Sequence, residues 1–80
     1  MTLDNIIAMI KMVEDDPLVP KNIKKAMAEA RQKLESGDGS DDVRASAALY
    51  IIEPLSNEPN IPVHTRTQIW NIISMLETVK

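Results

Sequence analysis

Cysteine and phenylalanine are absent from this 80-residue sequence, and Tyr50 and Trp70 are its only aromatic residues. Without cysteine the chain forms no disulfide, carries no thiolate nucleophile and offers no cysteine-ligated zinc or iron–sulfur site. Two aromatic residues are too few for the stacking surface that binds single-stranded nucleic acid. The net charge of −3 also differs from the basic balance of most nucleic-acid-binding domains. The composition therefore disfavours thiol chemistry and base stacking.

Long hydrophobic runs are also missing. Near the N-terminus the longest unbroken apolar run is Ile6–Ile10, and no positively charged segment precedes it. A signal peptide needs about 7–15 apolar residues and a membrane span about 20. We expect a soluble cytoplasmic protein with no membrane segment. Its length suits one domain, residues 1–80, with a thin core and a folded accessible surface of about 4,800 Å².

Apolar residues recur at three- and four-residue steps in four segments, which predicts four helices near residues 2–15, 20–36, 41–54 and 62–79. Thr2 and Ser40 are expected as N-caps, and Gly37 as a C-terminal cap. Pro20 suits the first helical position, where no amide donor is needed. No segment shows the strict alternation of a strand. The fold class is therefore predicted to be all-α.

An internal repeat is the strongest pattern in the sequence. A shift of 42 residues superposes Pro17 on Pro59 and Pro20 on Pro62, and it pairs Val19 with Ile61. Each half, about 1–36 and 43–80, is then a helix, a Pro-x-aliphatic-Pro turn and a second helix. A period near 42 is typical of HEAT and armadillo hairpins. We expect two similar helical hairpins, arranged as a HEAT-like pair or an up-and-down bundle, with Val19 and Ile61 buried.

Three stretches of the sequence match the pattern of a known family. They are residues 16–26 (Asp-Pro-Leu-Val-Pro through Ile-Lys-Lys-Ala), 43–48 (Val-Arg-Ala-Ser-Ala-Ala) and 56–70 (Ser-Asn-Glu-Pro through Gln-Ile-Trp). In this order the sequence resembles the small archaeal uncharacterised protein family 0147 over nearly its whole length. The resemblance implies an archaeal, all-helical protein and carries no known activity. Pro54 departs from the pattern expected of the family.

The third helical segment is apolar on most sides, because only Arg44 and Ser46 are polar between residues 43 and 52. Such a helix is normally central to its bundle or covered by a partner. Beside a stripe of Val43, Ala47 and Ile51, four further apolar residues look surplus to one thin core: Ala45, Ala48, Leu49 and Ile52. We therefore predict a homodimer through the third and fourth helices, with Trp70 as its anchor. Pro54 must end or kink the third helix.

The second helix is basic. It carries Lys21, Lys24, Lys25 and Arg31, which could contact phosphate groups or an acidic partner. The alternative is an ordinary solvated helix face. We take these four residues, together with Trp70, as the candidate partner surface.

His64 is the only histidine, and it lies in the turn that opens the fourth helix. It is either a general base or metal ligand near Glu58, or a polar residue of the first helical turn. The acidic stretch from Asp38 to Asp42 does not match a calcium-binding loop, since the required glycine falls on Val43. No nucleophile is placed beside a base. We expect no catalytic residue, no metal and no cofactor.

Three functions remain open. The first is a protein–protein interaction module or adaptor, as the paired hairpins suggest. The second is an RNA- or ribosome-associated accessory protein that uses the basic second helix. The third is an enzyme subunit too small to act alone, suggested only by His64 and the acidic turns. We favour the first and expect no enzymatic activity.

Overall fold

The computed structural model describes residues 2–36 and 38–79. Within them the chain forms no strand, and the prediction of an all-α fold is confirmed. The elements are α1 (Thr2–Asp15), α2 (Lys21–Ser36), α3 (Asp41–Ile52), the 3₁₀ helix η1 (Glu53–Asn57) and α4 (Val63–Glu77). The side chain of Thr2 and Gly37, both expected as caps, lie outside the described residues.

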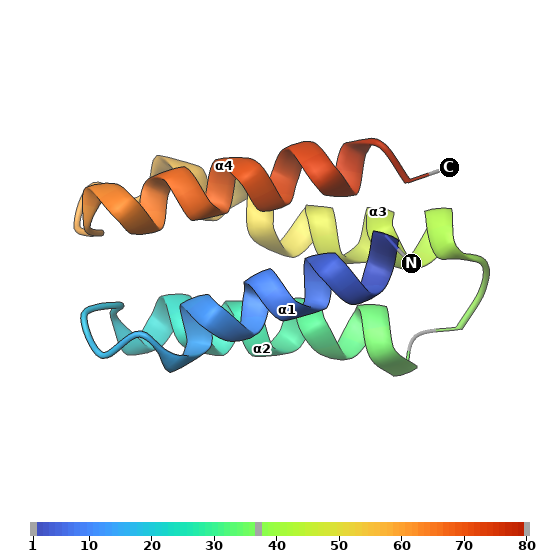
Figure 1. The fold of residues 1–80 in the computed structure, drawn as a ribbon, viewed down its shortest axis with the longest axis horizontal. Helices are drawn as coiled ribbons and strands as arrows, with labels where there is room; N and C mark the ends of the chain where they lie inside the picture. Colours follow the sequence, from blue (N-terminus) through green and yellow to red (C-terminus); the bar gives the residue numbers. More distant parts are fainter. Residues whose placement is uncertain (1, 37, 80) are drawn as a thin grey trace.

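The helices form two layers, with α1 and α2 in one and α3 and α4 in the other (Figure 1). Consecutive helices are antiparallel. Helix α1 packs on α2 and α4, and α3 also packs on α2 and α4. Helices α2 and α4 therefore occupy opposite corners of the bundle, whose extents are 33 × 20 × 19 Å. Both proline-containing turns lie at one end, and the start of α1 and the end of α4 lie at the other (Figure 1).

One hydrophobic core runs between the layers. Every α-helix contributes apolar side chains at helical spacing, among them Ile6, Ile10, Ile23, Met27, Leu34, Ala48, Ile52, Ile69, Ile72 and Leu76. Val19 and Ile61, the apolar residues of the two turns, are 4% and 8% exposed, so their predicted burial is confirmed. The accessible surface is 4811 Å², as the chain length predicts.

The prolines that end the two turns stand just outside the following helices. Helix α2 begins at Lys21, so Pro20 precedes the first helical residue, and the predicted start at residue 20 is one residue early. The Pro20 carbonyl oxygen accepts a hydrogen bond from the Lys24 amide at 3.1 Å. Pro62 and Arg66 repeat this bond, also at 3.1 Å, 42 residues later. The two turns thus enter their helices in the same way.

Helix α3 ends at Ile52, two residues before the predicted boundary at residue 54. Pro54 has no amide hydrogen, so it cannot donate to the carbonyl of Tyr50, and the chain tightens into η1. At the other end Ser40 is the N-cap, as predicted, and its carbonyl oxygen accepts from the Arg44 amide at 3.0 Å. Its hydroxyl bonds the Asp42 carboxylate instead of a helix amide.

Helix α4 begins one residue later than predicted, at Val63, and ends at Glu77, two residues short of residue 79. The last turn is closed by the Thr78 amide, which donates to the Met75 carbonyl oxygen at 3.1 Å. Val79 follows as a half-buried residue packed against the core. The apolar spacing therefore extended slightly beyond the helix itself.

Candidate interaction surface

The large apolar side chains that stand exposed are concentrated on α3 and α4. Among the described residues they are Met12, Leu18, Val43, Tyr50, Val63 and Trp70, and the last four belong to these two helices. Val43 and Tyr50 are seven residues apart, which is about two helical turns, and so are Val63 and Trp70. Each pair therefore shares one face of its helix, on the side that α1 and α2 leave uncovered.

The face of α3 that packs on the core differs from the one expected. Ala45, Ala48 and Ile52 are buried, and Leu49 packs against them, whereas Val43 is 53% exposed. The residues taken as surplus are therefore used inside the monomer and are not available for a dimer. The segment is apolar around most of its circumference, so its composition did not fix which side faced inward. What α3 offers to a partner is the opposite side, with Tyr50 83% exposed.

Carboxylates border these apolar side chains. Asp42 and Glu53 are both exposed and lie eleven residues apart, about three turns along the same side of the chain. Glu77 is exposed and lies seven residues after Trp70. The hydrogen bond from Ser40 lowers the pKa of Asp42 and keeps its carboxylate ionised. We call this surface the outer face, and it comprises Asp42, Val43, Tyr50, Glu53, Val63, Trp70 and Glu77.

Cations are less prominent on the same two helices. Arg44 and Arg66 are half-buried. The Arg66 guanidinium donates to the carbonyl oxygen of Glu58 at 3.3 Å, which holds it against the turn. The outer face therefore combines exposed aromatic side chains with exposed carboxylates.

A shallow pocket lies at the end of the outer face where α3 passes into η1. Its lining residues are Tyr50, Glu53, Pro54, Ser56 and Asn57. Four of these residues belong to the 3₁₀ helix η1, which follows α3 directly. Tyr50 and Glu53, three residues apart in the sequence, both belong to its lining. Sequence reasoning missed Tyr50 as a site residue, although its position seven residues after Val43 was a usable signal.

The basic residues of α2 form a separate surface. Lys21 and Lys25 are exposed and Lys24 is half-buried. Arg31 is not free for a partner. Its guanidinium lies 2.6 Å from the Glu14 carboxylate and 2.8 Å from that of Glu35.

Glu14 first, and then Glu35, raise the pKa of Arg31 above its usual range. Arg31 therefore joins α1 to α2 and is already paired within the bundle. Trp70 lies on α4, at the corner opposite α2, so the structure does not bring it together with the lysines.

His64 bonds a residue that its sequence position did not indicate. Its Nε2 lies 2.6 Å from Oδ2 of Asp16, which follows α1 in the first proline turn, and Glu58 is not its partner. This contact lowers the pKa of Asp16, and a hydrogen bond from the Leu18 amide at 2.9 Å lowers it further. The geometry ties the first proline turn to the start of α4. No group of three or more metal-ligating side chains occurs within residues 2–36 and 38–79.

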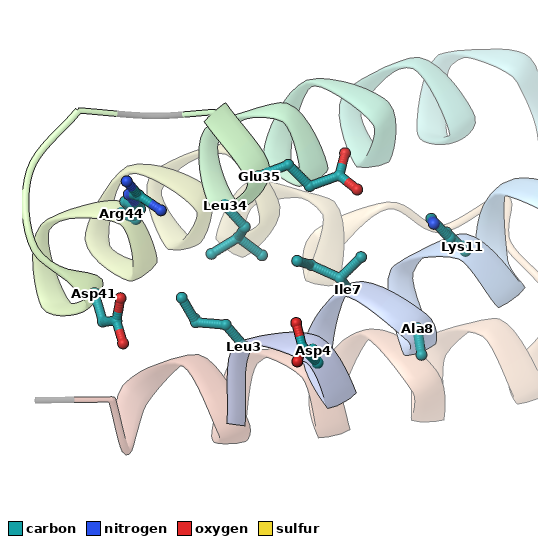
Figure 2. Close-up of a pocket in the computed structure, with 9 residues that line it drawn as sticks. All are labelled: Leu3, Asp4, Ile7, Ala8, Lys11, Leu34, Glu35, Asp41 and Arg44. Carbon is teal, nitrogen blue, oxygen red and sulfur yellow. The ribbon is translucent and has the colours of Figure 1, made fainter. Parts of the chain in front are cut away.

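A groove opens between α1 and α2 at the end opposite the proline turns (Figure 2). Leu3, Ile7 and Leu34 form its apolar floor. Its rim carries both signs of charge: Asp4, Lys11, Glu35, Asp41 and Arg44. The Nε atom of Arg44 is enclosed and has no hydrogen-bond partner in the described part of the chain. The mixed charges of this groove favour no one class of ligand.

No helix in the described ranges has the length and hydropathy of a transmembrane segment. A model of the uncharacterised protein family (UPF0147) matches residues 1–79 of the chain. A UPF0147 protein of the archaeon Sulfurisphaera tokodaii is 46% identical over 74 residues, which are 92% of this chain and 83% of that protein. One of Methanothermobacter thermautotrophicus is 37% identical over 79 residues, which are 99% of this chain and 78% of that protein.

Two crystal structures have the same fold. A crystallised protein of unknown function matches with a TM-score of 0.93 and 40% identity, over 99% of this chain and 90% of that one. A protein from the same uncharacterised family in Thermoplasma acidophilum matches with a TM-score of 0.90 and 30% identity, over 99% of this chain and 93% of that one. The four-helix arrangement is therefore shared with experimentally determined relatives.

Proposed function

The chain belongs to the uncharacterised protein family UPF0147, and we propose that it acts in the cytoplasm as a protein–protein interaction module without catalytic activity. The observation that carries the proposal is the exposure of Tyr50 and Trp70, 83% and 53%, on adjacent helices. Tyrosine and tryptophan are enriched among the residues that dominate binding energy at protein interfaces. Clustered exposed apolar side chains mark interaction sites more often than isolated ones do.

Site-specific photo-crosslinking tests this proposal in the organism that makes the protein. A crosslinking amino acid is placed at Tyr50 or Trp70, and in control variants at Met12 or Leu18. The controls match in exposure, since Met12 is 61% and Leu18 is 68% exposed, but they lie off α3 and α4. The proposal predicts discrete crosslinked products from positions 50 and 70 only. Equal yields from all four positions would contradict it.

A second copy of the chain is one partner that this surface could take, as a homodimer through α3 and α4. Four exposed apolar side chains remain for it on the outer face, although the alanines expected to contribute are buried. Sedimentation at micromolar concentration distinguishes a monomer of 8.9 kDa from a dimer of twice that mass. A dimer should weaken when Trp70 is replaced by serine.

The alternative function, RNA or ribosome association, rests on α2. Lys21 and Lys25 are exposed, and no ion pair engages them within the described part of the chain. Binding through them would fall steeply with salt, because each phosphate contact releases a counterion. Filter binding of bulk RNA between low and physiological salt tests this function. Loss of binding in Lys21→Gln/Lys25→Gln, with Tyr50→Ser unaffected, would favour it over the interaction module.

A further inference from the structure

We propose that the outer face of α3 and α4 binds a basic amphipathic helix of a partner protein, an inference that rests on the proposed function above. Its apolar side chains are flanked by the exposed carboxylates of Asp42, Glu53 and Glu77. A partner that buries its own apolar stripe there places its flanking side chains opposite these carboxylates. Lysine and arginine satisfy that arrangement, whereas acidic flanks are repelled.

The pocket at the end of α3 selects the same kind of side chain. Its lining includes Tyr50, which is 83% exposed, and Glu53. A lysine or arginine side chain that enters it lies over an aromatic ring and reaches a carboxylate at once, and both interactions favour a cation. Ser56 and Asn57 add polar groups at the pocket wall. The aromatic and acidic groups are thus combined in one place.

The shape of the face suits a helix. Helices α3 and α4 pack side by side and run antiparallel (Figure 1), and a third helix can pack across their outer sides by ridges and grooves. The longest extent of the molecule is 33 Å. A partner helix of about 14 residues spans roughly 21 Å and fits within that length. Its apolar residues would recur at three- and four-residue steps.

The charge of the outer face also favours a basic helix over a second copy of the chain, a nucleic acid or an anionic membrane. Two copies of the chain joined by their outer faces would bring the carboxylates of Asp42, Glu53 and Glu77 into one interface, with like charges near one another. Phosphate groups of a nucleic acid or an anionic membrane would meet the same repulsion. A basic helix is the partner whose charges these three carboxylates attract instead of repel.

The probe is a synthetic peptide of about 14 residues that contains only leucine and lysine, in the order that forms an amphipathic helix. A leucine–glutamate peptide of the same pattern is the matched control. Trp70 is the only tryptophan, so a blue shift of its emission reports burial on binding. The proposal predicts saturable binding of the lysine peptide at low salt, and none of the glutamate peptide. Equal binding of the two peptides would overturn it.

Variants locate the binding and separate it from nonspecific attraction. Tyr50→Ser is expected to weaken the binding of the lysine peptide about 10-fold, measured by calorimetry, whereas Met12→Ser leaves it unchanged. Glu53→Gln weakens it at low salt, and the difference from the wild type shrinks as salt is added. Each site is exposed, and circular dichroism confirms that each variant is folded. Equal losses in Met12→Ser and Tyr50→Ser would overturn the proposed location.

The two proposals fail differently. If crosslinks form at positions 50 and 70 but the lysine peptide does not bind, the interaction function stands and the basic helix is wrong. If crosslinking yields at positions 50 and 70 equal those at positions 12 and 18, the proposed function itself fails. A sedimenting dimer that Trp70→Ser dissociates would replace the basic helix with a second copy.

Discussion

The His64 imidazole and the Asp16 carboxylate, 48 positions apart in the sequence, meet at 2.6 Å and join the first proline turn to the start of α4. The other oxygen of the same carboxylate accepts the Leu18 amide at 2.9 Å. One acidic side chain thus fixes the shape of its own turn and the position of the neighbouring one. Because both turns lie at the same end of the bundle, this contact also holds the α1–α2 hairpin against the start of α4 (Figure 1).

Asp16→Asn should change how the protein responds to acid. The pKa of Asp16 is lowered in the folded state, chiefly by the hydrogen bond with His64. The ionised carboxylate therefore contributes its full stabilisation above the pKa of the unfolded chain, about 4. This stabilisation is lost as the pH falls through the lower pKa of the folded state. We expect the variant to be less stable than the wild type at neutral pH and to lose less stability below pH 4. Urea midpoints measured between pH 2 and 7 check this. In the control variant Asp15→Asn, at an exposed neighbouring position, the urea midpoint should change with pH as it does in the wild type. The same pH dependence in Asp16→Asn as in the wild type would contradict the prediction.

Arg31→Lys should destabilise the bundle although it keeps the charge. The Arg31 guanidinium bonds Glu14 through two of its nitrogens, at 2.6 and 3.0 Å, and Glu35 through the third at 2.8 Å. A lysine ammonium cannot reproduce this fork. We expect a loss of about 1 kcal/mol in urea unfolding, reduced by high salt. Lys33→Arg, on the same helix and exposed, serves as the neutral control, and equal stability of Arg31→Lys and the wild type would show that the Arg31 fork contributes nothing.

Ile61→Ala tests whether the second turn is part of the core. Ile61 is 8% exposed, so removal of its side chain leaves a cavity and should cost about 2–4 kcal/mol. Val63→Ala is the matched control, because Val63 lies two residues away and is 80% exposed. Its stability should lie within about 0.5 kcal/mol of the wild type. Similar unfolding midpoints for the two variants would mean that Ile61 does not support the turn.

Thr65→Val should stabilise the protein. Thr65 is fully buried, and its hydroxyl has no hydrogen-bond partner in the described part of the chain. Valine has nearly the same shape and removes the unpaired polar group, so we expect a gain of about 1 kcal/mol. Thr67→Val is the control, since Thr67 is exposed and its hydroxyl donates to the Val63 carbonyl oxygen at 3.3 Å. A lower thermal midpoint for Thr65→Val would show that the hydroxyl is satisfied.

Much of the fold was predictable because α1, α2 and α4 carry apolar residues at helical spacing and because two of the three connections contain a proline pair. The spacing of apolar residues placed α1 at its observed bounds and α2 to within one residue, and it predicted the burial of Val19 and Ile61. It overextended the third helix by two residues. Pro54 cannot donate a hydrogen bond to the carbonyl oxygen four residues earlier, so the α-helix ends before the proline, at Ile52. The turns were recognised because a proline pair recurs 42 residues apart.

The candidate surface was less predictable, for two physical reasons. The third helix is apolar on nearly all sides, so Val43 and Ala48 could each have faced the core, and only packing against α2 and α4 decides between them. Ion pairs between elements depend on which helices become neighbours. Arg31 was assigned to the partner surface and His64 was considered beside Glu58, but the bundle places Glu14 next to Arg31 and Asp16 next to His64. Trp70, predicted as part of the partner surface, is 53% exposed, and Tyr50, at 83%, was missed.

Amide chemical-shift mapping tests the central claim most directly, because it shows where on the bundle a partner sits. Uniformly labelled protein is titrated with the leucine–lysine peptide and followed by two-dimensional NMR. The account predicts shifts confined to residues 42–57 and 63–77, the segments that carry Tyr50, Glu53 and Trp70. Shifts centred instead on α1 and α2, around Lys25 or in the groove at Leu34, would contradict it.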